Sequence, residues 1–385
     1  MPLSFLSDFT SSVQVARCYR DEGGKPDRQP EFTQLDLEMS FAGREDILDL
    51  VEDLLAVCLP SPPPLPLPRI TYAEAMANYG VDKPDTRYTN AIQDLGPFFS
   101  GCGFDVIERM SENEEFFVGG VFFDGADPKS LKHVEKEVKQ AFSNELEDQK
   151  KNKDPVVISS LHTLDAQPVS SVLKKCEADT CTAVVEAVGR GRLGFIVACK
   201  RSLALPLLGR LRTALARDLI PDLGTRPHSL LWVVDFPMFL YEEGVLESAH
   251  HPFTAAHPDD HHLLTTDPLA CRSLHYDLVA DGQEIGGGSV RIHREEEQRY
   301  VLREVLGEQE EELEHLLTAL GSGAPPHAGI ALGLDRLLAI IARASSIRDV
   351  IAFPKSAEGR DLMAGAPATI TKEQKLLYHL AEPVS

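Results

Sequence analysis

The sequence predicts an α+β fold in which an antiparallel sheet is flanked by helices and carries an inserted α+β domain. Two segments with period-two alternation of polar and apolar residues, 13–41 and 276–293, indicate β-hairpins. Between them the pattern changes, because short apolar runs alternate with charged helical stretches from about residue 96 to residue 226. We therefore expect residues 1–95 and 227–385 to form one domain, with residues 96–226 inserted into it.

The composition is that of an ordinary globular protein, since 43% of the 385 residues are hydrophobic and 25% are charged. No run of eighteen apolar residues occurs, so we expect no membrane-spanning segment. The opening MPLSFLSDFTSS matches neither a secretory signal nor a transit peptide. Seven scattered cysteines without a CxxC pair favour free thiols in a reducing compartment. A net charge of −22 is opposite to that of a nucleic-acid-binding protein, so any RNA contact needs a local basic patch.

The first hairpin carries a high density of groups that can bind ligands. Residues 13–20 and 32–41 alternate as two strands around a charged loop, residues 21–31. The second strand has one apolar face, formed by Thr33, Leu35, Leu37, Met39 and Phe41. Surface strands with one polar face are common, but this hairpin also gathers Arg20, Asp21, Glu22, Gln29 and Asp36. Because arginine grips phosphates and carboxylates with two parallel hydrogen bonds, we expect the hairpin to bind an anion.

The next segment is predicted to cover this hairpin and then to leave it. Residues 44–58 place five apolar side chains on one helical face, those of Ile47, Leu48, Val51, Leu54 and Leu55. Residues 60–68, PSPPPLPLP, are expected to form a stiff connector, because proline fixes φ and lacks a main-chain donor. A short strand and a helix that opens near Thr71 should follow.

Two motifs outside the hairpins invite assignments that the surrounding sequence does not support. Gly189, Gly191 and Gly194 spell GxGxxG, but they precede an apolar strand rather than open a helix, so we reject a dinucleotide site. The run from His257 to His262 could hold a metal, but its proline and aspartates favour a loop and no cysteine lies nearby.

The second hairpin is preceded by a buried-type strand, residues 229–239, and turns at Asp281-Gly282, which predicts a type I′ turn. Its returning strand holds three consecutive glycines, 286–288, and such a run implies that another group approaches the backbone closely. The hairpin also carries Asp277, Glu284 and Arg291. Two carboxylates suit Mg²⁺ beside phosphates, and a separate arginine suits a substrate carboxylate. The alternative is an internal ion pair between Glu284 and Arg291, which leaves the glycines unexplained.

A third segment, residues 323–342, leads through Gly333 into a helix that should begin near Leu334, with Leu337, Leu338 and Ile341 as its apolar stripe. Arg336 then lies in the first turn, where the helix dipole disfavours a cation, so we expect it to face an anion such as phosphate. An ordinary surface arginine is the alternative. No Walker A motif occurs, so a bound ATP would lie on the antiparallel sheet between arginines.

Several strings resemble those of a known family. RDEGGKPDRQPEFTQLDLEMSF, residues 20–41, resembles motif 2 of class II aminoacyl-tRNA synthetases, specifically of aspartyl-tRNA synthetases of the bacterial and mitochondrial type. GLDR, residues 333–336, is similar to motif 3, and HHPFTA, EIGGGSVRIH and SIRDVIAFPKS are nearly the family's strings. YGVDKPDTR resembles the segment before the insertion that marks the bacterial type. The resemblance covers residues 13–385, and ESAHHPFTA looks nearer to animal mitochondrial forms.

This resemblance implies a role for each matching residue. Arg20 and Arg336 would be catalytic, contacting the α-phosphate and the γ-phosphate. Aspartate would be bound by Arg20, Asp36, His250 and Arg291, and Mg²⁺ by Asp277 and Glu284. The implied ATP-binding set consists of Arg20, Asp21, Glu22, Gln29, Glu284, Gly333, Leu334, Asp335 and Arg336.

The implied activity is aspartate–tRNA ligation in the mitochondrial matrix, with L-aspartate, ATP and tRNA(Asp) as partners, Mg²⁺ as cofactor and no membrane contact. The family's anticodon-binding domain, its motif 1 dimer contact and its QSPQ segment have no counterpart in these residues. The sequence thus resembles a member cut inside its catalytic domain, for which the family's homodimer is doubtful. A non-catalytic, synthetase-like binding protein or an inactive fragment is the alternative.

Overall fold

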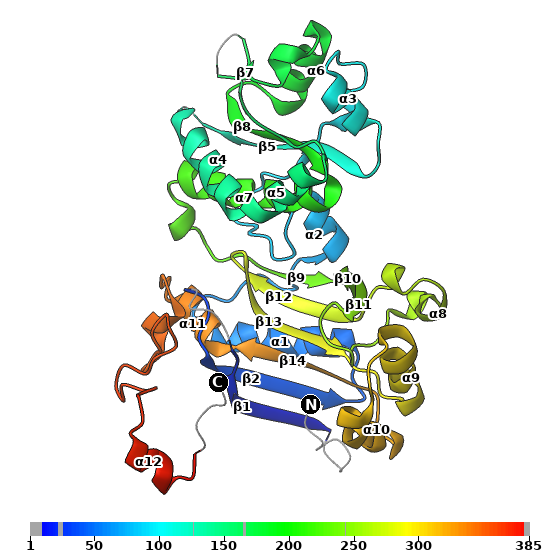
Figure 1. Ribbon diagram of the computed structural model, residues 1–385, viewed down its shortest axis with the longest axis vertical. Coiled ribbons are helices and arrows are strands. Elements are labelled where there is room, and N and C mark those ends of the chain that lie inside the picture. The colour runs from blue at the N-terminus through cyan, green and yellow to red at the C-terminus, as the bar shows by residue number, and fades with distance from the viewer. Residues whose placement is uncertain (1–9, 22–25, 126, 165–166, 243, 381–385) are drawn as a thin grey trace. The chain divides into compact units, whose positions relative to one another are not determined.

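The computed structural model describes residues 10–21, 26–125, 127–164, 167–242 and 244–380. These residues form two compact units, whose helices and strands are labelled in Figure 1. Among the described residues, the larger unit comprises Thr10 and Met39–Gly329, and the smaller unit comprises Ser11–Glu38 and Ile330–Leu380. Within them the sheets are mostly antiparallel and carry helices, which confirms the predicted α+β class.

The smaller unit is built on β1 (Ser11–Tyr19), β2 (Glu31–Ser40) and the second half of β14 (His327–Gly333), in the order β1-β2-β14. The predicted first hairpin is confirmed. Phe41 does not extend the apolar face as predicted, because β2 ends before it and its φ is 57° with the ring 77% exposed. The chain leaves the sheet at that residue.

Helix α11 (Leu334–Ile341) follows β14 directly and begins where the sequence predicted. Its predicted apolar stripe is wrong at Leu338, which is exposed, since Ala339 and Ile340 are the buried residues. The run LLAII, residues 337–341, places apolar side chains on both sides of the helix. The spacing of apolar residues therefore does not show which side of the helix is buried. A short 3₁₀ helix, Ile347–Val350, and α12 (Lys372–Leu377) complete this unit.

The larger unit contains a sheet portion in the order β13-β12-β9-β3, formed by β3 (Arg69–Thr71), β9 (Leu230–Val234), β12 (His275–Ala280) and β13 (Gln283–Val290). Strand β12 is antiparallel to both β9 and β13, whereas β3 runs parallel to β9. The predicted strand over 229–239 is shorter than expected, because Asp235 has a φ of 56° and ends it.

Two helices of the larger unit match their predictions. Helix α1 (Arg44–Cys58) buries one apolar face, and the buried Glu52 carboxylate accepts a hydrogen bond of 3.0 Å from Trp232 Nε1 on β9. Helix α2 (Tyr72–Tyr79) begins with a capping box between Thr71 and Glu74 and ends at Gly80, whose φ is 69°. That α1 packs against the first hairpin stays a prediction.

A five-stranded antiparallel sheet forms the other part of the larger unit, in the order β4-β5-β8-β6-β7. Its strands are β4 (Gln93–Asp94), β5 (Phe116–Asp124), β6 (Val157–His162), β7 (Val169–Ser170) and β8 (Arg192–Lys200). Strand β8 begins directly after Gly191 and contains Gly194, which confirms that the GxGxxG glycines lead into a strand and do not open a helix. The predicted boundaries of an inserted domain, 96–226, stay a prediction.

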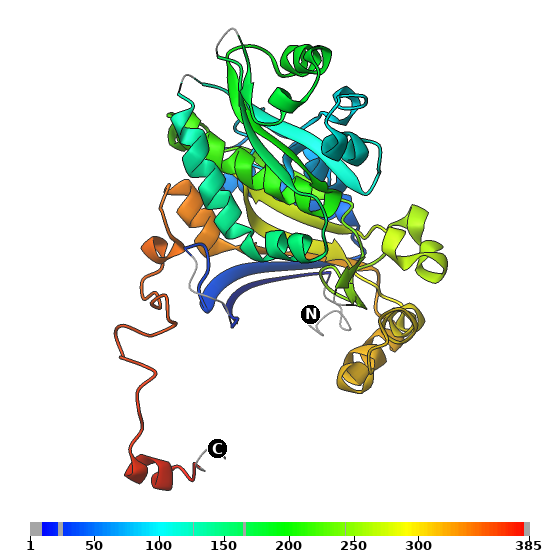
Figure 2. The ribbon, with the colours of Figure 1, turned by 45° about the horizontal axis from the view of Figure 1, so that its top comes forward.

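Helices cover both faces of this five-stranded sheet and produce two hydrophobic cores. Helix α4 (Lys129–Ala141) lies beside α7 (Arg201–Leu219) on one face, as Figure 2 shows. Helices α3 (Asp105–Ser111) and α6 (Ala178–Val188) pack on the opposite face. Helix α5 (Ser143–Lys151) follows α4.

The chain segments that enter and leave the five-stranded sheet are held together by two arginines, one buried and one partly exposed. Arg212 of α7 is 1% exposed, stacks 4.0 Å above the Tyr88 ring and donates 3.0 Å hydrogen bonds to the main-chain oxygens of Asp85 and Tyr88. Arg226, after α7, donates a 2.9 Å hydrogen bond to the main-chain oxygen of Arg87. The entry and exit segments therefore lie side by side.

The remaining elements are short. Strands β10 (Phe239–Glu242) and β11 (Val245–Ser248) pair with each other, and α8 (Leu263–Thr266), α9 (Glu295–Tyr300) and α10 (Glu314–Gly321) follow along the chain. All seven cysteines are free, as predicted. No helix in the described ranges is long and apolar enough to cross a membrane.

Candidate functional site

The β12–β13 hairpin gathers the predicted carboxylates of the larger unit. Its turn has a φ of 52° at Asp281 and 83° at Gly282, as a type I′ turn requires. A β-bulge between Leu278 and Val279 shifts the register, because Val279 pairs with Glu284 whereas Leu278 pairs with Gly286. The bulge therefore changes which side chains of β13 lie opposite those of β12.

Gly287 explains part of the glycine run. It pairs with Asp277 across the hairpin, and a Cβ at this position would lie 2.7 Å from Asp277 Oδ1 and 3.4 Å from Glu284 Oε1. The group that approaches the backbone is therefore the protein's own Asp277 carboxylate. Glycine at 287 leaves room for a carboxyl group to lie across the strand.

Asp277 is 2% exposed, and this burial raises the pKa of its carboxyl group to about 6. Its Oδ1 lies 2.9 Å from Nε2 of His275, two residues earlier on the same face of β12. Burial lowers the pKa of His275 to about 3, so this imidazole is neutral at pH 7. A hydrogen bond between neutral His275 and ionised Asp277 requires the proton to be on Nε2.

His250, predicted to bind the amino acid, stacks on His275 with ring centroids 3.6 Å apart and an interplanar angle of 19°. Both rings meet Phe236 edge-on at 4.9 Å. The protein atoms around His250 lower its pKa, and His275 adds to the lowering, although the residue keeps an exposed side. The stack therefore presents a neutral imidazole to solvent beside Asp277.

Lys83, like His275, is a site residue that the sequence did not predict. Its Nζ lies 3.2 Å from Glu284 Oε2 and 3.9 Å from Asp277 Oδ2. Burial alone would lower the pKa of Lys83, but these carboxylates and Asp82 outweigh it and raise the pKa. The signal for it lies in the string DKPDTR, residues 82–87, where Lys83 stands among aspartates.

Arg291 follows β13 and is half-buried. Its Nη1 donates a 2.6 Å hydrogen bond to Ser289 Oγ, and its main-chain nitrogen donates one of 3.0 Å to His327. His251 lies close enough that Arg291 adds to the lowering of its pKa, which burial dominates. Ser289 and the main-chain contact thus position this guanidinium among histidines.

In the histidine run from His257 to His262, His257 Nδ1 accepts a 3.3 Å hydrogen bond from the Asp259 main chain, and His261 lies 3.5 Å from Glu297. In the described ranges, the side chains that could jointly hold a metal ion are those of His250, His275 and Asp277, whose ligand atoms lie within 4.8 Å of one another.

The carboxylates of Asp277 and Glu284 supply the hard oxygen donors that Mg²⁺ prefers. They differ in access, because the Glu284 side chain is 35% exposed and that of Asp277 only 3%. The donor set therefore fits Mg²⁺ best through Glu284, with Asp277 behind it. The nearby ammonium of Lys83 already balances part of their negative charge.

In the smaller unit, Arg20 directly follows β1, and its guanidinium lies 5.3 Å from the centroid of the Phe32 ring. Its main-chain nitrogen donates a 2.9 Å hydrogen bond to Pro30, which closes the base of the charged loop. Asp21 is exposed at the start of that loop. Glu22 lies outside the described residues.

Gln29 connects the far end of the loop to the C-terminal segment. It is 2% exposed, and its Oε1 accepts a 2.7 Å hydrogen bond from the main-chain nitrogen of Lys355. The Lys355 ammonium lies 2.7 Å from Glu31 and 3.1 Å from Asp361. Gln29 is thus held in the protein by its oxygen, which leaves its role toward a nucleotide a prediction.

Asp36 lies on the polar face of β2 and is partly buried. Burial raises the pKa of its carboxyl group, and Glu38 adds to this. Its Oδ1 is buried and has no hydrogen-bond partner among the described residues. A buried carboxylate oxygen without a donor is costly, which suggests that a ligand supplies the donor.

The motif 3 residues, 333–336, contact the β1–β2 hairpin. Gly333 and Leu334 form the start of α11, and Asp335 Oδ2 accepts a 2.7 Å hydrogen bond from the Thr33 main chain. Arg336 reaches the loop, with Nη2 lying 3.4 Å from the main-chain oxygen of Asp27 and 3.8 Å from its carboxylate. Residues 27–33 and 333–336 are therefore in contact within this unit.

Known proteins show clear similarity to the chain. The model of the tRNA synthetases of class II (D, K and N) matches residues 3–357. The mitochondrial aspartate–tRNA ligase of Homo sapiens is 42% identical over 95% of this chain and 58% of its own length, and that of Rattus norvegicus is 43% identical over 95% and 57%.

A bacterial relative, the aspartate–tRNA(Asp/Asn) ligase of Bacillus cytotoxicus, is 38% identical over 98% of this chain and 64% of its own length. Among solved structures, an aspartyl tRNA synthetase from Entamoeba histolytica aligns with 17% identity and a TM-score of 0.43, over 92% of this chain and 49% of that one. The chain thus spans less than two thirds of the length of these relatives.

Proposed function

Because this chain belongs to the class II tRNA synthetases of the D, K and N group, we propose that it is an aspartate–tRNA ligase. It would activate L-aspartate with ATP and transfer the aspartyl group to tRNA(Asp). The observation that carries this proposal is identity of 42% over 95% of the chain to proteins named aspartate–tRNA ligase. Their mitochondrial names support a mitochondrial location, and we propose the matrix.

In the first step, an α-carboxylate oxygen of aspartate attacks the α-phosphorus of ATP. The new P–O bond forms as the bond to pyrophosphate breaks, which gives aspartyl-adenylate and pyrophosphate. No covalent enzyme intermediate is needed, so the protein contributes by positioning and by neutralising charge. Arg20 would contact the α-phosphate and Arg336 the γ-phosphate, with Asp21, Glu22, Gln29 and the start of α11 completing the nucleotide site.

Aspartate would be recognised at both of its ends. Asp36 would accept a hydrogen bond from the α-ammonium, which is supported by its buried oxygen that lacks a donor among the described residues. Arg291, fixed by Ser289, would pair with the side-chain carboxylate. A cation at this position disfavours asparagine, whose amide offers no charge and turns two donors toward the guanidinium.

The carboxylates of Asp277 and Glu284 would hold Mg²⁺, which when bound neutralises phosphate charge. The Lys83 ammonium lies 3.2 Å from Glu284 Oε2 and 3.9 Å from Asp277 Oδ2, so it balances part of their negative charge. His275 orients the Asp277 carboxylate through its Nε2 proton, and His250 covers that pair and faces the amino acid. The second step, attack by the terminal ribose hydroxyl of tRNA on the adenylate, would release AMP.

Exchange of labelled pyrophosphate into ATP tests the first step separately. We expect exchange that requires aspartate, that asparagine does not support, and that falls at least 100-fold in Arg336→Ala. Arg109→Ala provides a matched control, because this exposed arginine of α3 bonds only to its own helix among the described residues. Absence of aspartate-dependent exchange in the folded protein would reject the ligase assignment for this chain.

A further inference from the structure

One strand of the five-stranded sheet has an edge that its neighbour covers only in part. Strand β6 pairs with β8 along its whole length, from Val157 to His162. On its other side β7 pairs only with Leu161 and His162. Over the described residues, positions 157–160 therefore have no strand neighbour on that side. Alternate main-chain N–H and C=O groups of such an edge point outward and can accept another strand.

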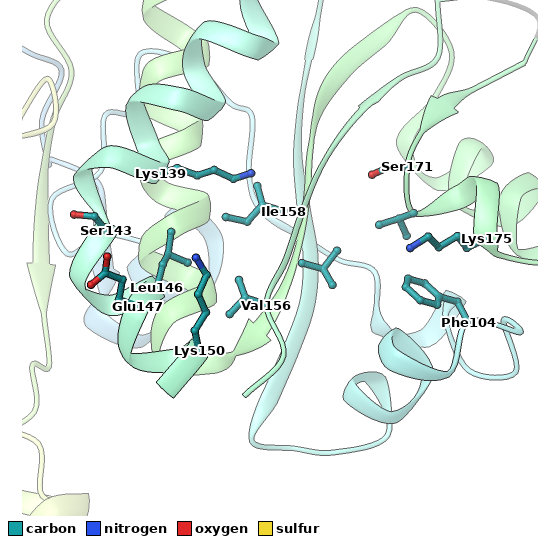
Figure 3. A pocket seen from close by; sticks show the side chains of 12 residues that line it. Phe104, Lys139, Ser143, Leu146, Glu147, Lys150, Val156, Ile158, Ser171 and Lys175 are labelled. Atoms are coloured by element: carbon teal, nitrogen blue, oxygen red, sulfur yellow. The ribbon is translucent and has the colours of Figure 1, made fainter. Parts of the chain in front are cut away.

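A groove of about 490 Å³ follows this edge. Figure 3 shows Val156 and Ile158 directed toward Leu146 of α5 on one side of the strand, with Phe104 on the other side. Since side chains alternate along a strand, Val157 faces the Phe104 side. The edge thus lies between two apolar walls, one on each face of the sheet.

The rim of the groove is basic in a chain whose net charge is −22. Lys139 and Lys150 lie on the helix α4–α5 side, and Lys175 lies on the opposite side, 4.7 Å above the Phe104 ring. Lys139 is paired with Glu135 at 2.6 Å, whereas the Lys150 ammonium has no partner among the described residues. Glu147 is the single carboxylate among the residues that line the groove.

We propose that this groove binds an extended acidic segment of a partner protein, which adds as a strand to β6. Main-chain hydrogen bonds to residues 157–160 would supply affinity. Acidic side chains at alternate positions would face Lys139 and Lys150, and the intervening apolar side chains would face Phe104 and Val172. Charge complementarity and the partly uncovered edge select this occupant.

A polypeptide fits these observations better than RNA does. Lysines alone would suit a phosphate backbone, but the floor of the groove is Val156, Ile158 and Leu146 rather than polar groups. Single-stranded RNA is usually held by aromatic rings on which bases stack. Here the one aromatic ring that lines the groove, Phe104, already carries the Lys175 ammonium.

The test uses the whole chain and a labelled nonapeptide in which glutamate and valine alternate. We expect binding detectable by fluorescence anisotropy, and slower hydrogen exchange at the outward-facing amides of residues 157–160. The double variant Lys139→Glu/Lys150→Glu should weaken binding at least tenfold. Lys132→Glu, an exposed lysine of α4 that does not line the groove, should change it less than twofold.

Two further probes separate strand addition from simple charge attraction. The same peptide with its three central residues N-methylated keeps every side chain but loses main-chain donors, and it should bind at least tenfold more weakly. Equal binding by this peptide, unchanged exchange at residues 157–160, or displacement of the labelled peptide by decauridylate would each overturn the proposal. None of these readouts depends on aminoacylation, so the result is independent of the proposed function.

Discussion

Asp277 combines burial, a histidine donor and a nearby lysine, and its protonation is coupled to folding. Burial raises the pKa of this carboxyl group from 3.8 to about 6. The folded protein therefore binds this proton more tightly than the unfolded chain does, and its stability falls as pH rises from about 4 to about 6. Above pH 6 the ionised carboxylate costs about 3 kcal/mol of the free energy of unfolding.

The substitution Asp277→Asn should remove this cost in metal-free buffer. Asparagine keeps an oxygen for the His275 proton, and His275 makes the same pH-dependent contribution in both proteins. We expect the variant to gain about 2 kcal/mol relative to the wild type between pH 4.5 and pH 7.5, with a constant difference above pH 7. Urea unfolding at several pH values measures this.

The exposed Asp127→Asn provides the control for the loss of one carboxyl group outside the β12–β13 hairpin. A stability difference between Asp277→Asn and the wild type that does not vary with pH would contradict the raised pKa of Asp277. Asp277→Asn should also lose aspartate-dependent exchange of pyrophosphate, because it lacks the carboxylate charge that the proposed reaction needs.

Some site residues could be predicted from the sequence and others could not. Asp277 and Glu284 stood out because they share a hairpin with three glycines. Lys83 did not, because its ion pair with Glu284 joins residues about two hundred positions apart, and neither periodicity nor turn chemistry reports such contacts. His275 was not predicted for a different reason: a histidine on a buried strand can also be an ordinary core residue without a role in ligand binding.

At the scale of elements, the β12–β13 hairpin is the best-predicted part of the protein. The Asp281-Gly282 pair fixes the turn, and period-two alternation fixes the strands. The bulge at Leu278/Val279 could not be predicted, because the packing of both strands decides where an extra residue is tolerated. The buried side of α11 was also not predictable, since apolar residues lie on both sides of this helix.

Gly287→Ala tests the close approach across that hairpin. The added Cβ would lie 2.7 Å from Asp277 Oδ1, and Asp277 cannot move freely because His275 and β12 hold it. We expect a loss of about 1–3 kcal/mol in the free energy of unfolding and at least a tenfold loss of exchange activity.

Gly224→Ala is the matched control, because no atom lies within 4 Å of the Cβ that it would add. It should change the free energy of unfolding by less than about 0.5 kcal/mol, which chemical denaturation can resolve. Unchanged stability and activity in Gly287→Ala would show that the glycine run serves another purpose.

At the scale of the larger unit, Arg212 joins α7 to the segment that precedes the five-stranded sheet. Arg212→Met keeps much of the side-chain volume but leaves the main-chain oxygens of Asp85 and Tyr88 without this donor. We expect a loss of about 3 kcal/mol or more in urea unfolding, because buried acceptors are left unsatisfied.

Arg210→Met, on the same helix, removes an exposed ion pair with Glu137 and should cost less than about 1 kcal/mol. Similar losses in the two variants would argue against a special role for the buried arginine. The alternation of short apolar runs and charged helical stretches predicted an α+β module here, but not this connection, because a buried arginine looks like a surface one in a single sequence.

The hydrogen bonds from Arg212 and Arg226 to residues 85–88 also affect the order in which the parts of the protein can fold. Strands β3 and β9 are parallel neighbours, yet α2 and the whole five-stranded sheet lie between them in the chain. Closing so long a loop is entropically unfavourable and slows folding. If the five-stranded sheet folds first, its joined ends leave only residues 72–86 and 227–229 to close the loop, and β3 meets β9 across a much shorter connection.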